Sequence, residues 1–177
     1  PTNPEWQLQF ELTADSGNTW SKSAPADPNG IPAIQPSVLF LGGDTLMAIG
    51  RTRKTEHLFR VVSNDLGKTW GQLQLTSLPN PNAGTDAVTI DDGRHLLVYN
   101  HTTKGRSPLN VAVSTDGSDW KSALELENEP GQEFSYPALI QSTDGKVHIV
   151  YTWKRKSIKH VVVDPKALKP ADFPAAQ

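Results

Sequence analysis

Residues 63–70 read Ser-Asn-Asp-Leu-Gly-Lys-Thr-Trp, and the fold of the chain can be argued outward from this octet. The carboxylate of Asp65 can accept hydrogen bonds from backbone N–H groups of its own turn, and Gly67 can adopt a backbone conformation that other residues resist. The large ring of Trp70 can then pack onto the hairpin that the turn closes. We therefore expect a self-contained turn between two antiparallel strands.

The octet recurs along the chain. Residues 13–20 keep Asp, Gly, Thr and Trp at the same four positions, and residues 114–120 form a copy that is one residue shorter. The copies end at Trp20, Trp70 and Trp120, a spacing of about fifty residues that is typical of repeat architectures.

Short stretches typical of strands accompany each copy. Residues 5–12 alternate polar and apolar side chains, which predicts a half-buried strand before the first copy. Three repeats follow, and in each of them turn signals separate three expected strands. These strands are 37–41, 45–50 and 57–63 in the first repeat, 86–90, 94–100 and 109–114 in the second, and 138–141, 146–152 and 158–163 in the third. Short antiparallel strands in this order describe the blades of a β-propeller.

The octet is the Asp box of BNR repeats, and the chain resembles the sialidase-like (neuraminidase-like) β-propellers. The resemblance implies an all-β fold, a six-bladed β-propeller of the sialidase type, of which this chain supplies about three blades from the C-terminal half. We expect one partial propeller over 1–177. It begins with the end of a blade at 1–20, continues with blades at 36–75 and 86–126 and most of a further blade at 137–164, and ends in a tail at 165–177. Because so few blades cannot close a ring, we expect the remaining half on the same larger chain, on a companion fragment or on a second copy.

Successive connections of such a blade alternate between the two ends of its sheet. One end, which we call the mouth, is therefore expected to collect the basic loops at 51–56, 101–108 and 153–157. The connections that lead into the first strands add four further residues to the mouth, Gln35, Asp86, Glu133 and Tyr136. A positively charged mouth suits an anionic ligand, although solvation alone also explains any single loop Lys or Arg.

Residues 134–139 read Phe-Ser-Tyr-Pro-Ala-Leu and precede an Asp-Gly turn and an apolar strand. This segment is similar to the one that holds the nucleophilic tyrosine of sialidases, and on that match Tyr136 is the catalytic nucleophile; the alternative is a packed core tyrosine. A neutral phenol can approach an anomeric carbon beside a substrate carboxylate, where Asp or Glu would be repelled. Its free pKa is about 10, so it needs a base, for which Glu133 and Asp86 are the candidates.

Residues 84–101 are similar to the sialidase stretch in which a Glu precedes a strand and the next strand delivers a carboxylate-binding Arg. In this chain Asp86 stands where Glu is usual, and Asn100 or His101 stands where Arg is expected. Sialidases hold the substrate carboxylate with three Arg side chains, because planar guanidinium groups match it bidentately. By loop position, we expect the substrate-binding residues to be Arg53, Arg106, Arg155, Gln35, Asn100 and Trp153. The last of these is either a platform for a sugar or a lid on the blade core.

The leading functional hypothesis is a sialidase-like exo-glycosidase or related carbohydrate-active protein that acts on an acidic sugar. A second hypothesis is a uronate polysaccharide lyase, in which His101 and Tyr136 form the proton-transfer pair; the alternative for His101 is a structural hydrogen bond in its loop. A third hypothesis is a non-catalytic glycan-binding propeller module.

Composition narrows the partners of the 177-residue chain. Its net charge of −2 argues against nucleic acid as the main partner, and the absence of a long apolar run argues against a membrane span. There is no cysteine, and the five His residues are not at ligand spacing, so we expect neither a metal site nor a cofactor. Because the sequence starts at Pro1 without Met, we expect a processed or excised piece, which favours a periplasmic or secreted location.

Overall fold

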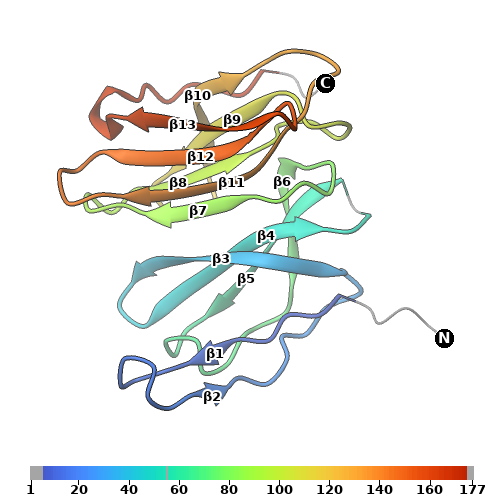
Figure 1. Cartoon of the computed structure of the whole chain (residues 1–177). Helices are drawn as coiled ribbons and strands as arrows, with labels where there is room; N and C mark the ends of the chain where they lie inside the picture. Colours follow the sequence, from blue (N-terminus) through green and yellow to red (C-terminus); the bar gives the residue numbers. More distant parts are fainter. Residues whose placement is uncertain (1–5, 55, 175–177) are drawn as a thin grey trace.

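A computed structural model describes residues 6–54 and 56–174, which form antiparallel sheets that follow one another in sequence order. Figure 1 shows them stacked from the N-terminal hairpin to the C-terminal sheet. The hairpin consists of β1 (Glu11–Leu12) and β2 (Ser21–Lys22). Sheet I contains β3 (Ala33–Gly42), β4 (Thr45–Thr52), β5 (His57–Ser63) and β6 (Gln74–Pro79). Sheet II contains β7 (Asp86–Thr89), β8 (His95–Tyr99), β9 (Leu109–Ser114) and β10 (Trp120–Glu127). Sheet III contains β11 (Phe134–Gln141), β12 (Val147–Trp153) and β13 (Ser157–Val163), and the 3₁₀ turn η1 (Pro165–Ala167) follows it.

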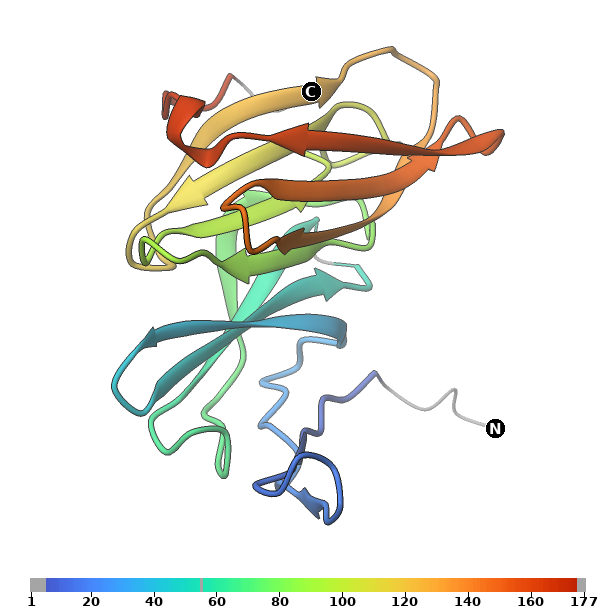
Figure 2. The same cartoon turned by 60° about the vertical axis from the view of Figure 1, so that its left-hand side comes forward.

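Each sheet is an up-and-down meander, because its strands are hydrogen-bonded in chain order. The first strands β3, β7 and β11 lie next to one another, with β7 in the middle (Figures 1 and 2). The chain is therefore all-β, and its three larger sheets are successive blades of a propeller.

The sheets extend beyond the ranges that the sequence predicted. The strands of sheet I span 33–79 rather than 36–75, and those of sheet III begin at Phe134 rather than at 137. The strand expected over 5–12 forms only at Glu11–Leu12, because the preceding residues make separate hydrogen bonds instead of a regular ladder. These bonds run from Ser23 N–H to the Phe10 carbonyl (2.9 Å) and from Ala26 N–H to the Leu8 carbonyl (3.0 Å). Residues 1–5 and 175–177 of the predicted terminal segments lie outside the described residues.

The Asp box of sheet I has the geometry that its sequence indicates. The Asp65 carboxylate accepts hydrogen bonds from the Thr69 N–H (2.9 Å) and from the Thr69 hydroxyl (2.6 Å), and Gly67 has a φ of +85°. The Trp70 indole N–H donates to the Gly67 carbonyl at 3.0 Å. Leu66 N–H bonds to the carbonyl of Asp44 at 3.0 Å, so the β3–β4 turn lies at the same end of the sheet as the Asp box.

The core lies between neighbouring sheets. One cluster joins sheet I to sheet II through buried residues that include Leu39, Met47, Leu97 and Trp120. A second cluster joins sheet II to sheet III, and a third joins the N-terminal segment to sheet I. Sheets II and III therefore each pack one face against the sheet that precedes them, and sheet I packs against the N-terminal segment.

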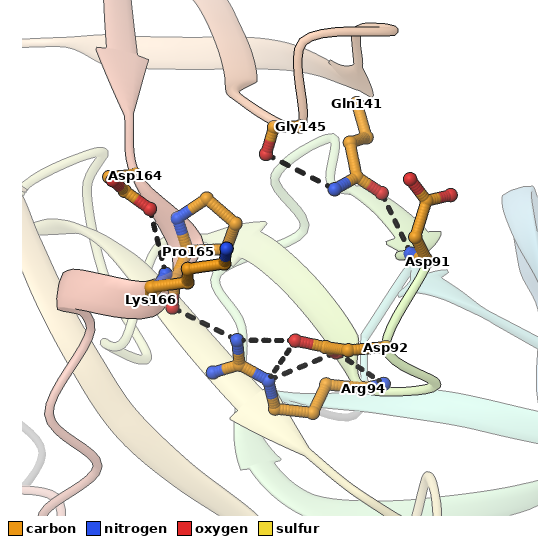
Figure 3. A network of polar contacts seen from close by, with 8 residues as sticks. All are labelled: Asp91, Asp92, Arg94, Gln141, Gly145, Asp164, Pro165 and Lys166. Carbon is orange, nitrogen blue, oxygen red and sulfur yellow. Dashed lines mark hydrogen bonds and ion pairs between the residues drawn. The ribbon is translucent and has the colours of Figure 1, made fainter.

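Polar contacts fix sheet III and the following tail onto sheet II at the end away from the mouth (Figure 3). The side chain of Gln141 accepts from Asp91 N–H at 2.7 Å. Arg94 pairs with Asp92 at 2.7 Å and also donates to the carbonyl of Pro165 at 3.0 Å. The chain then returns along β10, where Ser122 and Ala171 exchange two backbone hydrogen bonds of 2.9 and 2.8 Å. None of the helices in the described part of the chain has the length and hydropathy that a membrane span requires.

Candidate functional site

Tyr136 leaves the regular ladder of β11 at a bulge. The register between β11 and β12 shifts between Ser135 and Ala138, and Tyr136 has a φ of +50°, a region that few residues other than Gly adopt. Its side chain is 54% exposed. Gln35 repeats this arrangement in β3, with a φ of +54° at a similar register shift and a proline after it. Backbone strain of this kind concentrates at functional sites, which marks this part of the mouth.

Gly84 lies between these two residues. A Cβ atom on Gly84 would be 3.1 Å from Cδ1 of Tyr136 and 3.9 Å from Oε1 of Gln35. A side chain at this position would therefore force the Tyr136 ring to shift, and glycine leaves it in place. They line a hollow of about 250 Å³ whose wall also includes Thr85 and Asp86.

Two arginines from neighbouring sheets converge on the backbone carbonyl of Asn82, and one of them, Arg106, lies beside Tyr136. Arg51, on β4, and Arg106, in the β8–β9 loop, both donate to the backbone carbonyl of Asn82, at 3.1 and 3.4 Å. The guanidinium of Arg106 lies 5.7 Å from the centre of the Tyr136 ring. Several buried polar atoms have no hydrogen-bond partner among the described residues, and three of them belong to this cluster: the donors Nε of Arg51 and Nη1 of Arg106, and the acceptor Oδ1 of Asn82. Buried donors are ordinarily satisfied, so these two suit an acceptor supplied by a ligand.

Glu133 and Arg155 form an ion pair on the other side of Tyr136. Oε2 of Glu133 lies 2.5 Å from Nε of Arg155, and Oε1 accepts from the hydroxyl of Ser135 at 2.9 Å. The hydrogen bond from Arg155 holds the pKa of Glu133 below its usual value, so this carboxylate is ionised at neutral pH. Both residues and Tyr136 line a second hollow, of about 460 Å³.

Asp86 is held by hydrogen bonds from three sheets. It accepts from the Ser37 hydroxyl of β3 at 2.7 Å, from Ala87 N–H of its own strand at 2.9 Å, and from Leu139 N–H of β11 at 2.9 Å. The sequence suggested a base for Tyr136 at this position. In the structure this carboxylate accepts three hydrogen bonds from the strands around it.

Asn100 and His101 do not join Tyr136. His101 is buried, its ring shares a hydrogen bond with Tyr99 and stacks on Phe173 at 4.5 Å, and burial lowers its pKa, so the neutral form is favoured. Asn100 is fully buried and donates to the carbonyls of Pro108 (2.9 Å) and Phe134 (3.0 Å). Both side chains turn inward, because nearby buried backbone and ring atoms need polar partners.

Arg53 and Trp153 also differ from the predicted binding set. The guanidinium groups of Arg51 and Arg53 both lie over the Trp6 ring, at 5.3 and 5.7 Å from its centre, but only Arg51 also bonds to the Asn82 carbonyl. Arg51 takes the place beside Arg106 instead, because it is still part of β4. Trp153 packs against the core between sheets II and III, with Nζ of Lys154 4.5 Å from its ring centre, and so corresponds to the lid rather than to an open platform. The described residues hold no group of three or more His, Asp or Glu side chains arranged for a metal ion.

Comparisons with known proteins agree with this architecture. Residues 2–149 match the family described as BNR repeat-like domain. The fold is similar to NanB sialidase from Streptococcus pneumoniae, with a TM-score of 0.75 and 17% identity over 93% of this chain and 28% of that chain. It is similar to an intramolecular trans-sialidase from Ruminococcus gnavus, with a TM-score of 0.74 and 20% identity over 93% of this chain and 39% of that chain. It is also similar to a leech intramolecular trans-sialidase, with a TM-score of 0.74 and 18% identity over 93% of this chain and 28% of that chain. The chain thus spans well under half of each of these proteins, and no curated protein matches its sequence.

Proposed function

Because this chain belongs to the BNR repeat-like domain family and supplies about three blades of a six-bladed, sialidase-type propeller, we propose that its mouth carries part of an acidic-sugar site of a sialidase-like glycoside hydrolase. One observation carries the proposal. Arg51 and Arg106 share the Asn82 carbonyl beside Tyr136, and each keeps a buried N–H group without a partner among the described residues.

In this proposal the two guanidinium groups bind the carboxylate of the sugar. Charge-assisted hydrogen bonds from arginine to a carboxylate are shorter and stronger than neutral ones, and they fix the orientation of the ligand. Arg155 is already paired with Glu133 and therefore contributes to the field at the mouth rather than to this clamp.

Tyr136 is the proposed nucleophile, because its phenol is exposed next to the clamp and is not repelled by the ligand carboxylate. The phenolic oxygen would form a bond to the anomeric carbon while the bond to the leaving oxygen breaks, and the leaving oxygen would take its proton from water. Glu133 is ionised and lines the same hollow, which makes it the proposed acceptor of the phenol proton. Asp86 would position the strand that carries Tyr136, since Leu139 N–H bonds to it.

Calorimetric titration with 2,7-anhydro-Neu5Ac, the compound in the leech trans-sialidase structure, tests the clamp. We expect binding that weakens at least tenfold in Arg51→Ala and in Arg106→Ala, because each change removes one charged donor, and that weakens similarly when the ligand is the methyl ester. Arg60→Ala is the matched control, since Arg60 bonds to Ser118 and Gln74 on the outer strands. Equal binding of acid and ester, or no effect of Arg106→Ala, would refute the clamp.

A non-catalytic glycan-binding module is the second candidate, and it is favoured by the position of Gln35 next to the Tyr136 ring. The group beside the Tyr136 ring is a neutral amide, while Asp86 and Glu133 are both engaged by other residues. Turnover of 4-methylumbelliferyl N-acetylneuraminic acid separates the two candidates. A hydrolase loses turnover but keeps binding in Tyr136→Phe, whereas a binding module shows binding without turnover in either protein. The uronate lyase is not carried further, because its pair of His101 and Tyr136 is not assembled.

A further inference from the structure

The hollow of about 250 Å³ beside Tyr136 differs in charge from the arginine cluster next to it. Its wall is formed by the bulges of β3 and β11 and by the residues that lead into β7. Among the described residues that line it, Asp86 is the only charged one, and neither Arg51 nor Arg106 belongs to the wall. The hollow therefore carries negative charge, whereas the cluster at the Asn82 carbonyl carries positive charge.

Asp86 makes the hollow unfavourable for an anionic group. Its carboxylate accepts from the Ser37 hydroxyl at 2.7 Å and from the N–H groups of Ala87 and Leu139 at 2.9 Å each. All three donors are uncharged, so they do not neutralise the carboxylate. A ligand carboxylate placed here would meet a like charge, whereas a hydroxyl or an amide would not.

Gln35 presents an uncharged hydrogen-bonding group to this hollow. Its backbone has a φ of +54° at the register shift between Ile34 and Ser37, a conformation that is costly for a residue other than glycine. The side chain is exposed and makes no hydrogen bond to another described residue. Its Oε1 atom lies 3.9 Å from the place where a Cβ of Gly84 would be, so the amide stands at the hollow. An amide both donates and accepts, and therefore suits a hydroxyl or another amide.

Thr85 adds a second uncharged group to the wall. The residue is 9% exposed, and its hydroxyl is buried without a hydrogen-bond partner among the described residues. Rotation about the Cα–Cβ bond exchanges the positions of the hydroxyl and the methyl group, which can turn the hydroxyl toward a group that enters the hollow. Buried polar groups are ordinarily satisfied, so this hydroxyl suits such a partner.

We propose that the hollow is a second subsite, in which Gln35 and Thr85 bind an uncharged hydroxyl or amide substituent of the acidic sugar. The second subsite rests on the proposed function, because the neighbouring arginines would hold the carboxylate of the same sugar. Tyr136 adjoins both, since it lines the hollow and its ring centre lies 5.7 Å from the guanidinium of Arg106. Gln35 would thus select sugar acids that carry such a substituent over simple carboxylic acids.

Calorimetric titration of Gln35→Met with 2,7-anhydro-Neu5Ac and with its methyl ester tests the role of Gln35. Methionine keeps the length of the side chain and removes its hydrogen bonds, so both ligands should bind about three- to tenfold more weakly, by the same factor. Arg106→Ala should instead affect the acid more than the ester. Gln74→Met is the matched control, because Gln74 lies on β6 and bonds to Arg60. Unchanged affinity in Gln35→Met, or a loss confined to the acid, would overturn the second subsite.

Thr85→Val removes the hydroxyl and keeps the shape of the side chain. Because this hydroxyl has no partner among the described residues, urea unfolding should show no loss of stability in the variant, while both ligands bind more weakly. A variant that loses stability and keeps its affinity would show a structural hydroxyl and overturn the assignment of Thr85.

Fragment titrations separate the second subsite from the proposed function, because they do not depend on the arginines. The side-chain NH₂ signals of Gln35 are followed by ¹⁵N NMR of the full chain while glycerol, acetamide or acetate is added. A shift with glycerol assigns a hydroxyl to the hollow and a shift with acetamide assigns an amide, and either shift should persist in Arg51→Ala. Signals that neither uncharged fragment moves, or that acetate alone moves, would overturn the second subsite whatever the acid and ester titrations show.

Discussion

A single carboxylate, that of Asp86, connects the first strands of three sheets at the mouth. Its acceptors are occupied by Ser37 on β3, by Ala87 on its own strand and by Leu139 on β11. The bond to Leu139 lies just after the bulge that exposes Tyr136. We therefore interpret Asp86 as a positioning residue, which acts on the site through the strand that it holds.

Asp86→Asn tests this interpretation. The amide keeps the size of the side chain but replaces one acceptor oxygen by a donor, which then faces the Leu139 N–H or the Ser37 hydroxyl. We expect a loss of about 1 kcal/mol in the free energy of unfolding, because one hydrogen bond of a half-buried side chain is no longer matched. Urea unfolding measures the loss, and titration with 2,7-anhydro-Neu5Ac should show weaker binding in the same variant. Asp91→Asn is the control, because only its backbone N–H bonds to Gln141. Unchanged stability would mean that the three bonds are dispensable.

Asp65 makes the stability of the Asp box depend on pH. Hydrogen bonds from the Thr69 side chain and backbone lower the pKa of Asp65 from 3.8 to about 2. A carboxyl whose pKa is lower in the folded state stabilises the fold above its unfolded pKa, and this contribution disappears as the pH falls toward the folded pKa. We therefore expect Asp65→Asn to be less stable than the wild type at pH 7, with a difference that shrinks between pH 4 and pH 2. Thermal unfolding across this range measures the difference, and Asp44→Asn in the adjacent turn is the control. A difference that stays constant down to pH 2 would contradict the assignment.

At the scale of elements, the bulges of β3 and β11 shape the mouth, and Gly84 keeps the space between them open. Gly84→Ala would put a methyl group 3.1 Å from the Tyr136 ring, which must then move. No positive φ is required at Gly84, so the backbone tolerates alanine and the effect falls on the ring. We expect binding of 2,7-anhydro-Neu5Ac to weaken about tenfold, by about 1.4 kcal/mol, with little change in stability. Gly71→Ala is the matched control, because its new Cβ would meet only the Val62 carbonyl at 3.5 Å. Equal effects of the two substitutions on binding would contradict a specific role for Gly84.

The elements that the sequence predicted well are those specified by local patterns. The Asp, Gly and Trp of residues 63–70 determine their own turn, and the short apolar stretches within 94–100 and 109–114 indicate strands whatever surrounds them. The bulge at Tyr136 has no comparable local signal beyond the proline that follows. It depends on partners that are distant in the sequence, such as Gly84 and Asp86.

The direction of side chains in the loops was predictable only in part. The sequence identified Tyr136, Gln35 and Arg106 as mouth residues, and the structure places them at adjoining positions around Gly84 and Asn82. It favoured Arg53 over Arg51, because a loop arginine is the ordinary expectation for a binding residue. The choice depends on where β4 ends, and strand ends are not set by a residue pattern. Asn100 and His101 lie on the correct loop but turn inward to satisfy Phe134 and Tyr99.

At the scale of the whole molecule, the residues after β13 hold the outer edge of sheet II. Ala171 pairs with Ser122, Lys121 lies 3.2 Å from Asp172, and Phe173 stacks on His101. We expect Phe173→Ala to lower the free energy of unfolding by about 1–2 kcal/mol, since the ring is half-buried and its apolar contacts are lost. Urea unfolding measures the loss, and ligand binding at the mouth should be unchanged. Leu168→Ala, in the same segment but against the core between sheets II and III, separates loss of this contact from general loosening of the tail. A strong effect of Phe173→Ala on ligand binding would show that the tail reaches the mouth after all.

The carbonyl of Asn82, which both arginines contact, links sheet I to sheet II. Arg51 extends from sheet I and Arg106 from sheet II, and both end on one oxygen atom in the chain segment that links the two sheets. An anion bound between the two guanidinium groups would act as a tether across the seam between the sheets, and separating the sheets would require that tether to break. Occupancy of the mouth would then add to the apolar core and to the Ser37–Asp86 hydrogen bond that already hold sheet I against sheet II.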